Sequence, residues 1–233
     1  MKKLSIILLA VLVAVSAVCA YKIYVIAKEN RDNKKAFSEI EQMLGVDENP
    51  YKKLAEINPD FVGWISVEGT QINYPVMQSK DNPDYYLNHS FEKEYSRFGV
   101  PYLDGDGIIG QSNNLIVYGH HMKGGSMFAE LVKYSHHEFW HEHQYIEFNT
   151  IGTKGRYEVV AAFAYDTNKE EFNYTYFTDM DEDEFAEYVC EVEHRSVYDT
   201  EINAEYGDEL LTLSTCEYSH VNGRFVVVAK RVA

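Results

Sequence analysis

Hydrophobic patterning divides the chain into an apolar start, a helical stretch and a long region of short apolar runs. The segment from Leu4 to Tyr21 holds no charged residue over 18 positions, and its apolar character continues past Lys22 to Ala27. A helix of this length spans the hydrocarbon core of a bilayer, and a lysine near its end reaches the aqueous interface. We therefore expect residues 1–28 to form a signal anchor that crosses a membrane once.

Two other interpretations of this segment are open. A cleaved signal peptide is the main one, because Val18-Cys19-Ala20 is an acceptable cleavage site. A lipoprotein modified at Cys19 is disfavoured, since Val18 stands where a small residue is expected. Basic residues lie on both sides of the segment, so the positive-inside rule does not decide its orientation. These residues are Lys2, Lys3, Lys28, Arg31, Lys34 and Lys35.

Helical spacing continues after the apolar segment. Residues 30–44 place Phe37, Ile40, Met43 and Leu44 on one stripe, which predicts an amphipathic helix. Residues 51–57 form a second short helical piece that ends at Asn58-Pro59. We expect residues 29–58 to be an N-terminal helical arm.

From residue 59 onward the pattern changes to short β-like runs separated by turn signals. Helical spacing interrupts them at 126–134 and at 181–194, where Asp181 and Glu184 resemble a capping box. Many short strands with few helices favour a closed or nearly closed β-barrel, so we expect residues 59–233 to be one mainly β domain. The predicted strands cover residues 61–67, 72–77, 100–103, 114–118, 145–149, 156–165, 209–216 and 224–232.

Charge narrows the classes of partner. The net charge is −16, and the first 28 residues carry four lysines and no acidic residue, so the rest of the chain carries −20. Nucleic acid and anionic lipid headgroups would repel such a domain. We therefore expect partners that are peptides or neutral or cationic polymers. The 19 tyrosines and 12 phenylalanines argue against a disordered chain.

The candidate catalytic residues lie at the ends of predicted strands. Cys216 ends an apolar strand and opens a polar loop, which suits a nucleophile, although a buried structural cysteine is the alternative. His120 follows another strand and titrates in the range that a thiol's proton shuttle needs, with His121 as its rival. Arg224 begins the next strand and can donate to an oxyanion, or else form a surface ion pair. Spacing alone does not show that these groups converge.

The number of cysteines is consistent with a reactive thiol in the folded domain. Cys19 lies in the apolar segment, which leaves Cys190 and Cys216 as the pair available for one disulfide in the folded domain. Three unevenly placed cysteines do not form a disulfide framework. An odd thiol in an exported protein raises the possibility of a reactive cysteine.

Metal sites are the competing chemistry, and we expect none. His137 and His141 stand four residues apart, yet a polar helix and loop explain the four nearby histidines better. Asp104 and Asp106 lie in Asp-Gly-Asp-Gly without the rest of a calcium-loop pattern, so we interpret them as a turn. The four histidines are His136, His137, His141 and His143.

Several segments together resemble the sortase family, and within it class B. The run Thr212-Leu-Ser-Thr-Cys216 matches the family motif TLxTC, and Arg224 follows at the family's distance. Tyr118-Gly-His-His-Met122 matches the segment that carries the family histidine, which is His120. The stretches 86–89 and 99–104 and the helix at 181–194 also resemble class B. The resemblance covers residues 36–233.

This resemblance implies both a fold and an activity. The fold is an eight-stranded β-barrel with an N-terminal helical arm and a long helix between the sixth and seventh strands. The activity is cleavage of a C-terminal pentapeptide sorting signal after Thr through a Cys216 thioester, followed by transfer of the secreted protein to an amine of the peptidoglycan precursor. His120 would move protons and Arg224 would hold the oxyanion.

The remaining expectations concern supporting residues, location and rival functions. Ser214, Thr215 and the backbone N–H of Glu217 are candidate substrate or oxyanion contacts, and no cofactor is expected. The domain is expected on the extracellular face of the cell membrane. The alternatives are a cysteine peptidase or peptidoglycan hydrolase, and a non-catalytic surface binding protein on a sortase-like fold.

Overall fold

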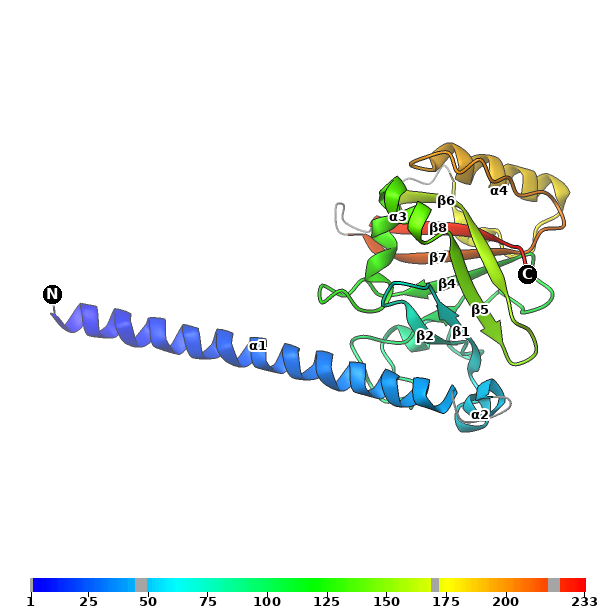
Figure 1. The fold of residues 1–233 in the computed structure, drawn as a ribbon. Coiled ribbons are helices and arrows are strands. Elements are labelled where there is room, and N and C mark those ends of the chain that lie inside the picture. Colours follow the sequence, from blue (N-terminus) through cyan, green and yellow to red (C-terminus); the bar gives the residue numbers. More distant parts are fainter. Residues whose placement is uncertain (1, 45–49, 169–171, 218–222) are drawn as a thin grey trace. The chain divides into compact units, whose positions relative to one another are not determined.

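The computed structural model describes residues 2–44, 50–168, 172–217 and 223–233, with only the backbone described at residues 2, 3, 216 and 217 (Figure 1). The chain forms two compact units, Met1–Val46 and Asp47–Ala233.

The first unit is a single long helix, α1 (Lys2–Leu44). The chain has no proline or glycine over this range, so nothing in the backbone interrupts the helix between the apolar segment and the predicted helix at 30–44. From Leu4 on, α1 is long and apolar enough to cross a membrane. Because the helix has no break at residue 28, the end of the anchor stays a prediction.

The second unit begins with α2 (Pro50–Ile57) and continues into eight described strands that close a barrel. The predicted closed barrel is therefore confirmed. Its strand order is β1-β2-β3-β4-β7-β8-β6-β5, and β5 pairs with β1. The strands are β1 (Phe61–Ser66), β2 (Asn73–Met77), β3 (Tyr102–Leu103), β4 (Asn114–Gly119), β5 (Tyr145–Thr150), β6 (Arg156–Asp166), β7 (Leu210–Glu217) and β8 (Gly223–Arg231).

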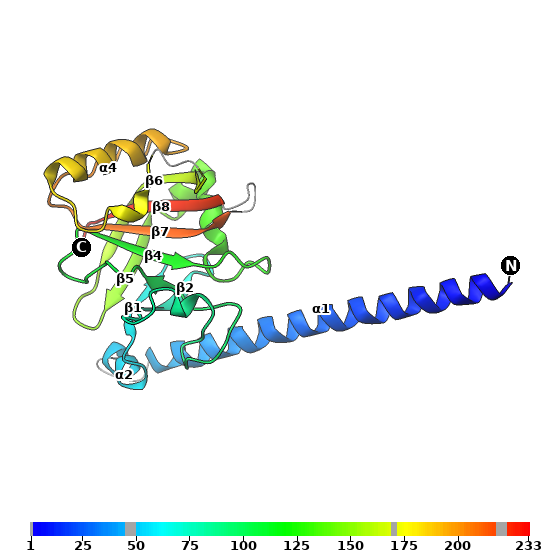
Figure 2. The same ribbon diagram turned by 180° about the vertical axis from the view of Figure 1, so that it is seen from behind.

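Strand pairing explains why distant segments meet. β7 and β8, which are close together in the sequence, pair antiparallel, whereas β4 and β7 pair parallel. A parallel pair needs a long crossover, and here the chain between β4 and β7 supplies two further strands and several helical segments. Figure 2 shows β4, β7, β8 and β6 side by side, in agreement with the strand order.

The helix predicted at 126–134 is a 3₁₀-helix, η2 (Phe128–Ser135). Its fully buried side chains, Phe128, Leu131 and Tyr134, recur every third residue, which matches the three residues per turn of a 3₁₀-helix better than the 3.6 of an α-helix. The sequence pattern does not predict two short 3₁₀-helices, η1 (Tyr85–Leu87) and η3 (Tyr174–Tyr176). The short helix α3 (His137–Glu142) lies where a polar helix and loop were the preferred interpretation of the four histidines.

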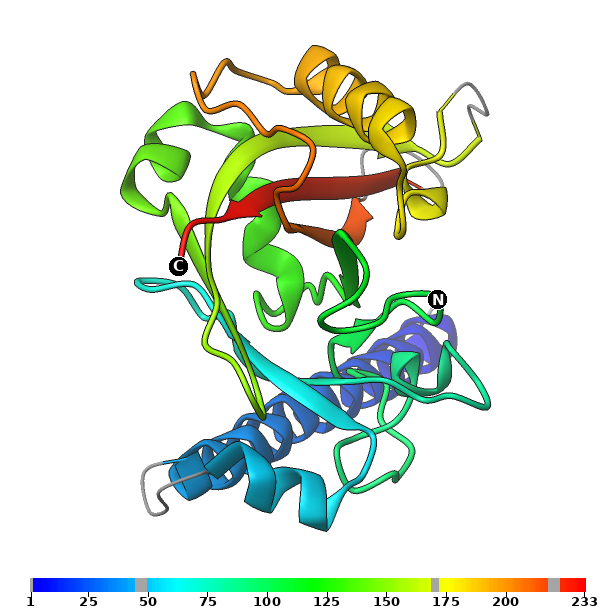
Figure 3. The same cartoon turned by 90° about the vertical axis from the view of Figure 1, so that its right-hand side faces the viewer.

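The helix between the sixth and seventh strands is α4 (Glu182–Arg195), as predicted. The Asp181 side chain accepts from the Glu184 N–H at 2.9 Å, and the Glu184 side chain accepts from the Asp181 N–H at 3.0 Å, which confirms the capping box. Phe185, Tyr188 and Val192 are buried in a cluster with residues of β6, β7 and β8. Figures 1 and 3 show α4 lying across the outside of these strands.

Removal of the cap should weaken α4. We expect Asp181→Ala to lower the free energy of unfolding by about 1 kcal/mol, because the Glu184 N–H loses its acceptor. The exposed Glu187→Ala variant removes the same charge from the middle of the same helix and should change stability by less than about 0.5 kcal/mol. Urea unfolding of both variants tests this, and equal losses would contradict a capping role.

Candidate active site

The ends of β4, β7 and β8 lie next to one another. Gly119, the last residue of β4, pairs with Thr215 of β7, and the next residue of β7, Cys216, pairs with Arg224 of β8. His120 follows Gly119 directly in the chain. The backbone therefore brings the segments that carry the three predicted catalytic residues to one end of the barrel, although the side chain of Cys216 lies outside the described part.

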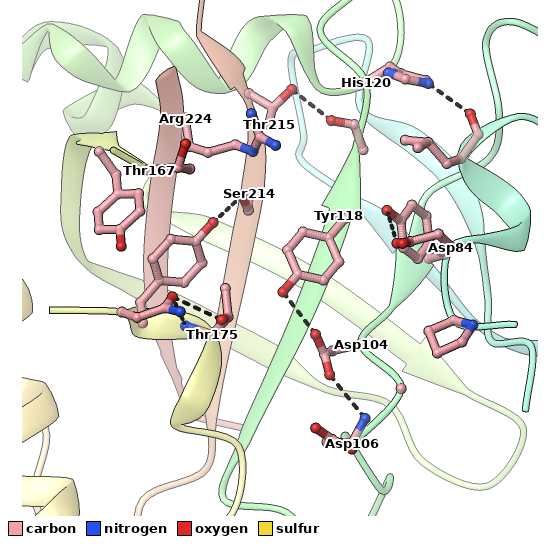
Figure 4. Close-up of a pocket in the computed structure, with 18 residues that line it drawn as sticks. Asp84, Asp104, Asp106, Tyr118, His120, Thr167, Thr175, Ser214, Thr215 and Arg224 are labelled. Carbon is pink, nitrogen blue, oxygen red and sulfur yellow. Dashed lines mark hydrogen bonds between the residues drawn. The ribbon is translucent and has the colours of Figure 1, made fainter. Parts of the chain in front are cut away.

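A pocket of about 530 Å³ opens at this end of the barrel (Figure 4). His120 and Arg224 line it, together with Ser214 and Thr215, so four of the predicted site residues share one pocket. The rest of its described wall comes mainly from the loops around η1, β3 and η3 and from the tyrosines of β4 and β6. His121 is not among the described residues that line this pocket.

The His120 ring has a defined hydrogen-bond partner. Its Nε2 lies 2.7 Å from the carbonyl oxygen of Leu87, the last residue of η1 (Figure 4). A carbonyl oxygen can only accept, so Nε2 carries the hydrogen and Nδ1 is the nitrogen left for proton exchange. The backbone is held as well, because the Phe128 N–H donates to the His120 carbonyl oxygen at 2.9 Å.

Gly119 lets the histidine segment pack closely on η2. A Cβ at residue 119 would lie 2.6 Å from the ring of Phe128, which is fully buried, so the ring or the strand would have to shift. The glycine before His120 is therefore required by packing rather than by an unusual backbone angle. It fixes the approach of β4 to the 3₁₀-helix that also holds the His120 carbonyl.

The hydroxyls of Ser214 and Thr215 already have partners inside the protein. The Ser214 hydroxyl lies 2.7 Å from that of Tyr174, and the Thr215 hydroxyl donates to the Gly119 carbonyl oxygen at 2.7 Å. Both residues are about 1% exposed, which leaves little of either side chain open to a ligand. Glu217 pairs with Gly223 through the backbone.

Arg224 is held by strands on both sides. It pairs with Cys216 of β7 and with Tyr165 of β6, and it is half-buried. Its Nη1 donates to the Gly223 carbonyl oxygen at 3.2 Å, and the side chain lines the pocket. Figure 4 shows Arg224 among the residues that line the pocket. A positive charge is therefore present at the end of β7 that carries Cys216.

Sequence reasoning missed a tyrosine–carboxylate pair in the pocket. The Tyr118 hydroxyl donates to Asp104 Oδ2 at 2.8 Å, and the Asp106 N–H donates to Asp104 Oδ1 at 2.9 Å. Burial raises the pKa of Tyr118 far above its usual value, and the charge of Asp104 raises it further, so the phenol stays protonated. Tyr118 and Asp104 were visible in the sequence, but nothing in their spacing indicated that they meet.

The other candidate clusters have structural partners. His143 Nδ1 lies 2.8 Å from the Glu68 carbonyl oxygen, and the His137 ring packs against Trp140 and Tyr198. Within the described ranges, no group of three or more potential ligands is arranged to hold a metal ion. Cys190 is an exposed free thiol on α4.

Comparison with known proteins agrees with this fold. The family model of the sortase domain matches residues 65–232. Sortase B of Staphylococcus aureus is 36% identical over 242 residues, which cover 99% of this chain and 97% of that protein. A solved S. aureus sortase B–substrate complex has a TM-score of 0.79 at 32% identity and covers 88% of this chain and 98% of its own. A sortase B complexed with triglycine has a TM-score of 0.77 at 34% identity, over 88% and 98%.

The chain therefore belongs to the sortase family, whose members are cysteine transpeptidases. Its similarity to sortase B extends over nearly its whole length in sequence, and its solved relatives of this class share the barrel. The class B resemblance inferred from the motifs is confirmed, and so is the assignment as a transpeptidase.

A methyl group at residue 119 should disturb the site more than the rest of the barrel. We expect Gly119→Ala to lower the free energy of unfolding by about 1–3 kcal/mol, because the Phe128 ring or the end of β4 must shift. Transpeptidation should fall as well, since Gly119 precedes His120. Gly152→Ala is the matched control, because a Cβ there meets nothing within 4 Å. Wild-type activity in Gly119→Ala would contradict this packing constraint.

Proposed function

We propose that this sortase cleaves a C-terminal pentapeptide sorting signal after Thr and transfers the secreted protein to an amine of the peptidoglycan precursor. One observation carries the proposal. Residue 216 pairs with Arg224 and stands one step beyond the Gly119–Thr215 pair, at the end of the barrel where His120 and Arg224 line a single pocket.

Cys216 is the nucleophile of the proposed reaction. Its thiolate sulfur attacks the Thr carbonyl carbon of the signal, and a tetrahedral intermediate forms. When the peptide C–N bond breaks, the C-terminal fragment leaves as an amine and a thioester remains on Cys216. The incoming amine attacks the thioester carbon, and cleavage of the C–S bond returns the thiolate.

His120 moves the protons through Nδ1. Because Nε2–H donates to the Leu87 carbonyl oxygen, that nitrogen is engaged throughout, and Nδ1 exchanges the proton. An imidazolium at residue 120 protonates the leaving amine as the C–N bond breaks. The neutral ring then takes a proton from the incoming amine, which restores the starting state.

Arg224 stabilises the charge that develops on the carbonyl oxygen. Its guanidinium offers several donors in a fixed plane, which suits an oxyanion and the neighbouring peptide backbone. The backbone N–H of Glu217 is the second proposed donor, by its position after Cys216. Ser214 and Thr215 serve as pocket wall, because their hydroxyls are bonded within the protein.

Two related structures support the choice of substrates. One S. aureus sortase B was solved as a substrate complex, and another sortase B structure holds triglycine. We assign a peptide signal and a peptide-borne amine to this chain by that similarity. The acidic composition of residues 29–233 agrees with a peptide or polymer partner rather than nucleic acid. The proposed reaction needs no metal or cofactor.

The N-terminal helix determines the proposed location. Residues 1–28 act as an uncleaved signal anchor with the N-terminus inside, residues 29–58 form the helical arm, and residues 59–233 are the catalytic domain on the extracellular face. The length and apolar character of α1 support membrane insertion.

A covalent adduct tests the proposed function. Incubation of residues 29–233 with a panel of fluorogenic sorting peptides should give cleavage, and mass spectrometry should find the acyl group on Cys216. Cys216→Ala should give neither product, because the thioester cannot form. Cleavage by Cys216→Ala, or an adduct on another residue, would refute the assignment. Binding of the peptides without any cleavage would favour the non-catalytic alternative.

Arg224 should be sensitive even to a conservative change. We expect Arg224→Lys to lower kcat/KM on the order of 10²-fold, because an ammonium group cannot reproduce the planar set of donors. Arg231→Lys is the matched control on the same strand, since Arg231 pairs with Glu209 away from the pocket. Its kcat/KM should stay at the wild-type value. A wild-type kcat/KM for Arg224→Lys would contradict the oxyanion role.

A further inference from the structure

One side-chain bond ties the strand that ends at His120 to the strand that carries Cys216. The Thr215 hydroxyl donates to the Gly119 carbonyl oxygen at 2.7 Å. These two residues are also the last pair in the β4–β7 register. Thr215 is about 1% exposed, so water does not compete readily for its hydroxyl.

We infer that Thr215 is a positioning residue, whose hydroxyl sets the spacing between His120 and Cys216. Each of these residues follows directly after one partner of the bond, His120 after Gly119 and Cys216 after Thr215. The inference rests on the proposed roles of His120 and Cys216. It adds Thr215, whose hydroxyl bonds the backbone of Gly119 rather than either reacting side chain.

The need for such a bond follows from where the ladder ends. Beyond Gly119 the chain leaves β4, so no further backbone pair with β7 holds residue 120 in register. The other bonds of His120 run elsewhere, because its ring bonds Leu87 and its carbonyl accepts from Phe128. These two contacts fix the histidine relative to η1 and η2. The Thr215 bond instead fixes the end of β4, which precedes His120, relative to β7.

The direction of the bond separates positioning from direct catalysis. A hydroxyl has one hydrogen, and the hydrogen of Thr215 goes to the Gly119 carbonyl. It cannot at the same time donate to a substrate oxyanion, which is the role that the sequence suggests for this residue. Loss of the hydroxyl should therefore act through the geometry of the cysteine–histidine pair.

The test compares three variants of the chain. Thr215→Val keeps the shape and removes the donor, Thr215→Ser keeps the donor, and Thr215→Ala serves if the valine variant does not fold. Thr212→Val is the matched control, because the Thr212 hydroxyl is equally buried on β7 and donates to Asn114 of β4 at 2.9 Å, four residues before Cys216. Steady-state kinetics with a sorting peptide, pH–rate profiles and thermal unfolding are measured for each.

Thr215→Val should lower kcat at least about tenfold with little change in KM, because a small misplacement of reacting groups slows the chemical step. Its pH–rate profile should shift, since the coupling of thiol and imidazole changes. Thr215→Ser should restore kcat to within about threefold of wild type on the same geometric grounds. Thr212→Val should unfold at a lower temperature yet keep the wild-type kcat and pH profile.

Three results would overturn the inference. A wild-type kcat in folded Thr215→Val or Thr215→Ala would show that the bond does not set the geometry. A rise in KM alone would make Thr215 a binding residue. If Thr212→Val lost as much kcat as Thr215→Val, the loss would follow from lower stability rather than from the geometry of the site. Failure of the proposed function would give a different result from failure of this inference. In that case the wild-type enzyme itself would form no acyl adduct on Cys216.

Discussion

The parallel pairing of β4 with β7 is the constraint on which the site depends. It joins residues such as Gly119 and Thr215, which are 96 positions apart in the chain, and it orients both strands so that they end on the same side of the barrel. β8 then returns antiparallel and brings Arg224 beside Cys216. The proposed nucleophile, proton carrier and cation can converge only because these three strands are neighbours in this order.

Packing around the pairing keeps it in register. Thr212 of β7 donates to Asn114 of β4 and accepts from Tyr188 of α4, so one buried hydroxyl connects two strands and the covering helix. Ser214 makes a similar contact with Tyr174 from η3. Buried hydroxyls that are fully bonded specify a register more strongly than apolar contacts alone, because a slipped strand would leave them without partners. The Ser-containing form of the motif thus has a structural use two residues before Cys216.

The local elements were largely predictable from the sequence, whereas their assembly was not. Apolar runs predicted the strands, and Asp181 with Glu184 predicted the start of α4, because both signals are local. The parallel β4–β7 pairing depends on contacts between distant segments, so no local pattern contained it. The 3₁₀ geometry of η2 was missed because a short apolar stripe fits two helical periods.

The same holds for the site: its candidate residues could be predicted from the sequence, but their contacts could not. Strand-end positions indicated Cys216, His120 and Arg224 from the residues themselves, and the family motif supplied their roles. The Tyr118–Asp104 pair and the His120–Leu87 bond escaped prediction because each joins segments that meet only in the folded barrel. Ser214 and Thr215 were expected to contact the substrate or the oxyanion. Their hydroxyls have partners within the protein, which only tertiary packing reveals.

The most direct test is a crystal structure of the enzyme after reaction with a sorting peptide whose scissile carbonyl carries a thiol-reactive group. The peptide should be bonded to the sulfur of Cys216, with His120 Nδ1 and the Arg224 guanidinium facing the attacked carbon and its oxygen, and with His120 Nε2 still bonded to the Leu87 carbonyl. An adduct on another residue, or a His120 ring and Arg224 group turned away from the sulfur, would contradict convergence of the three side chains.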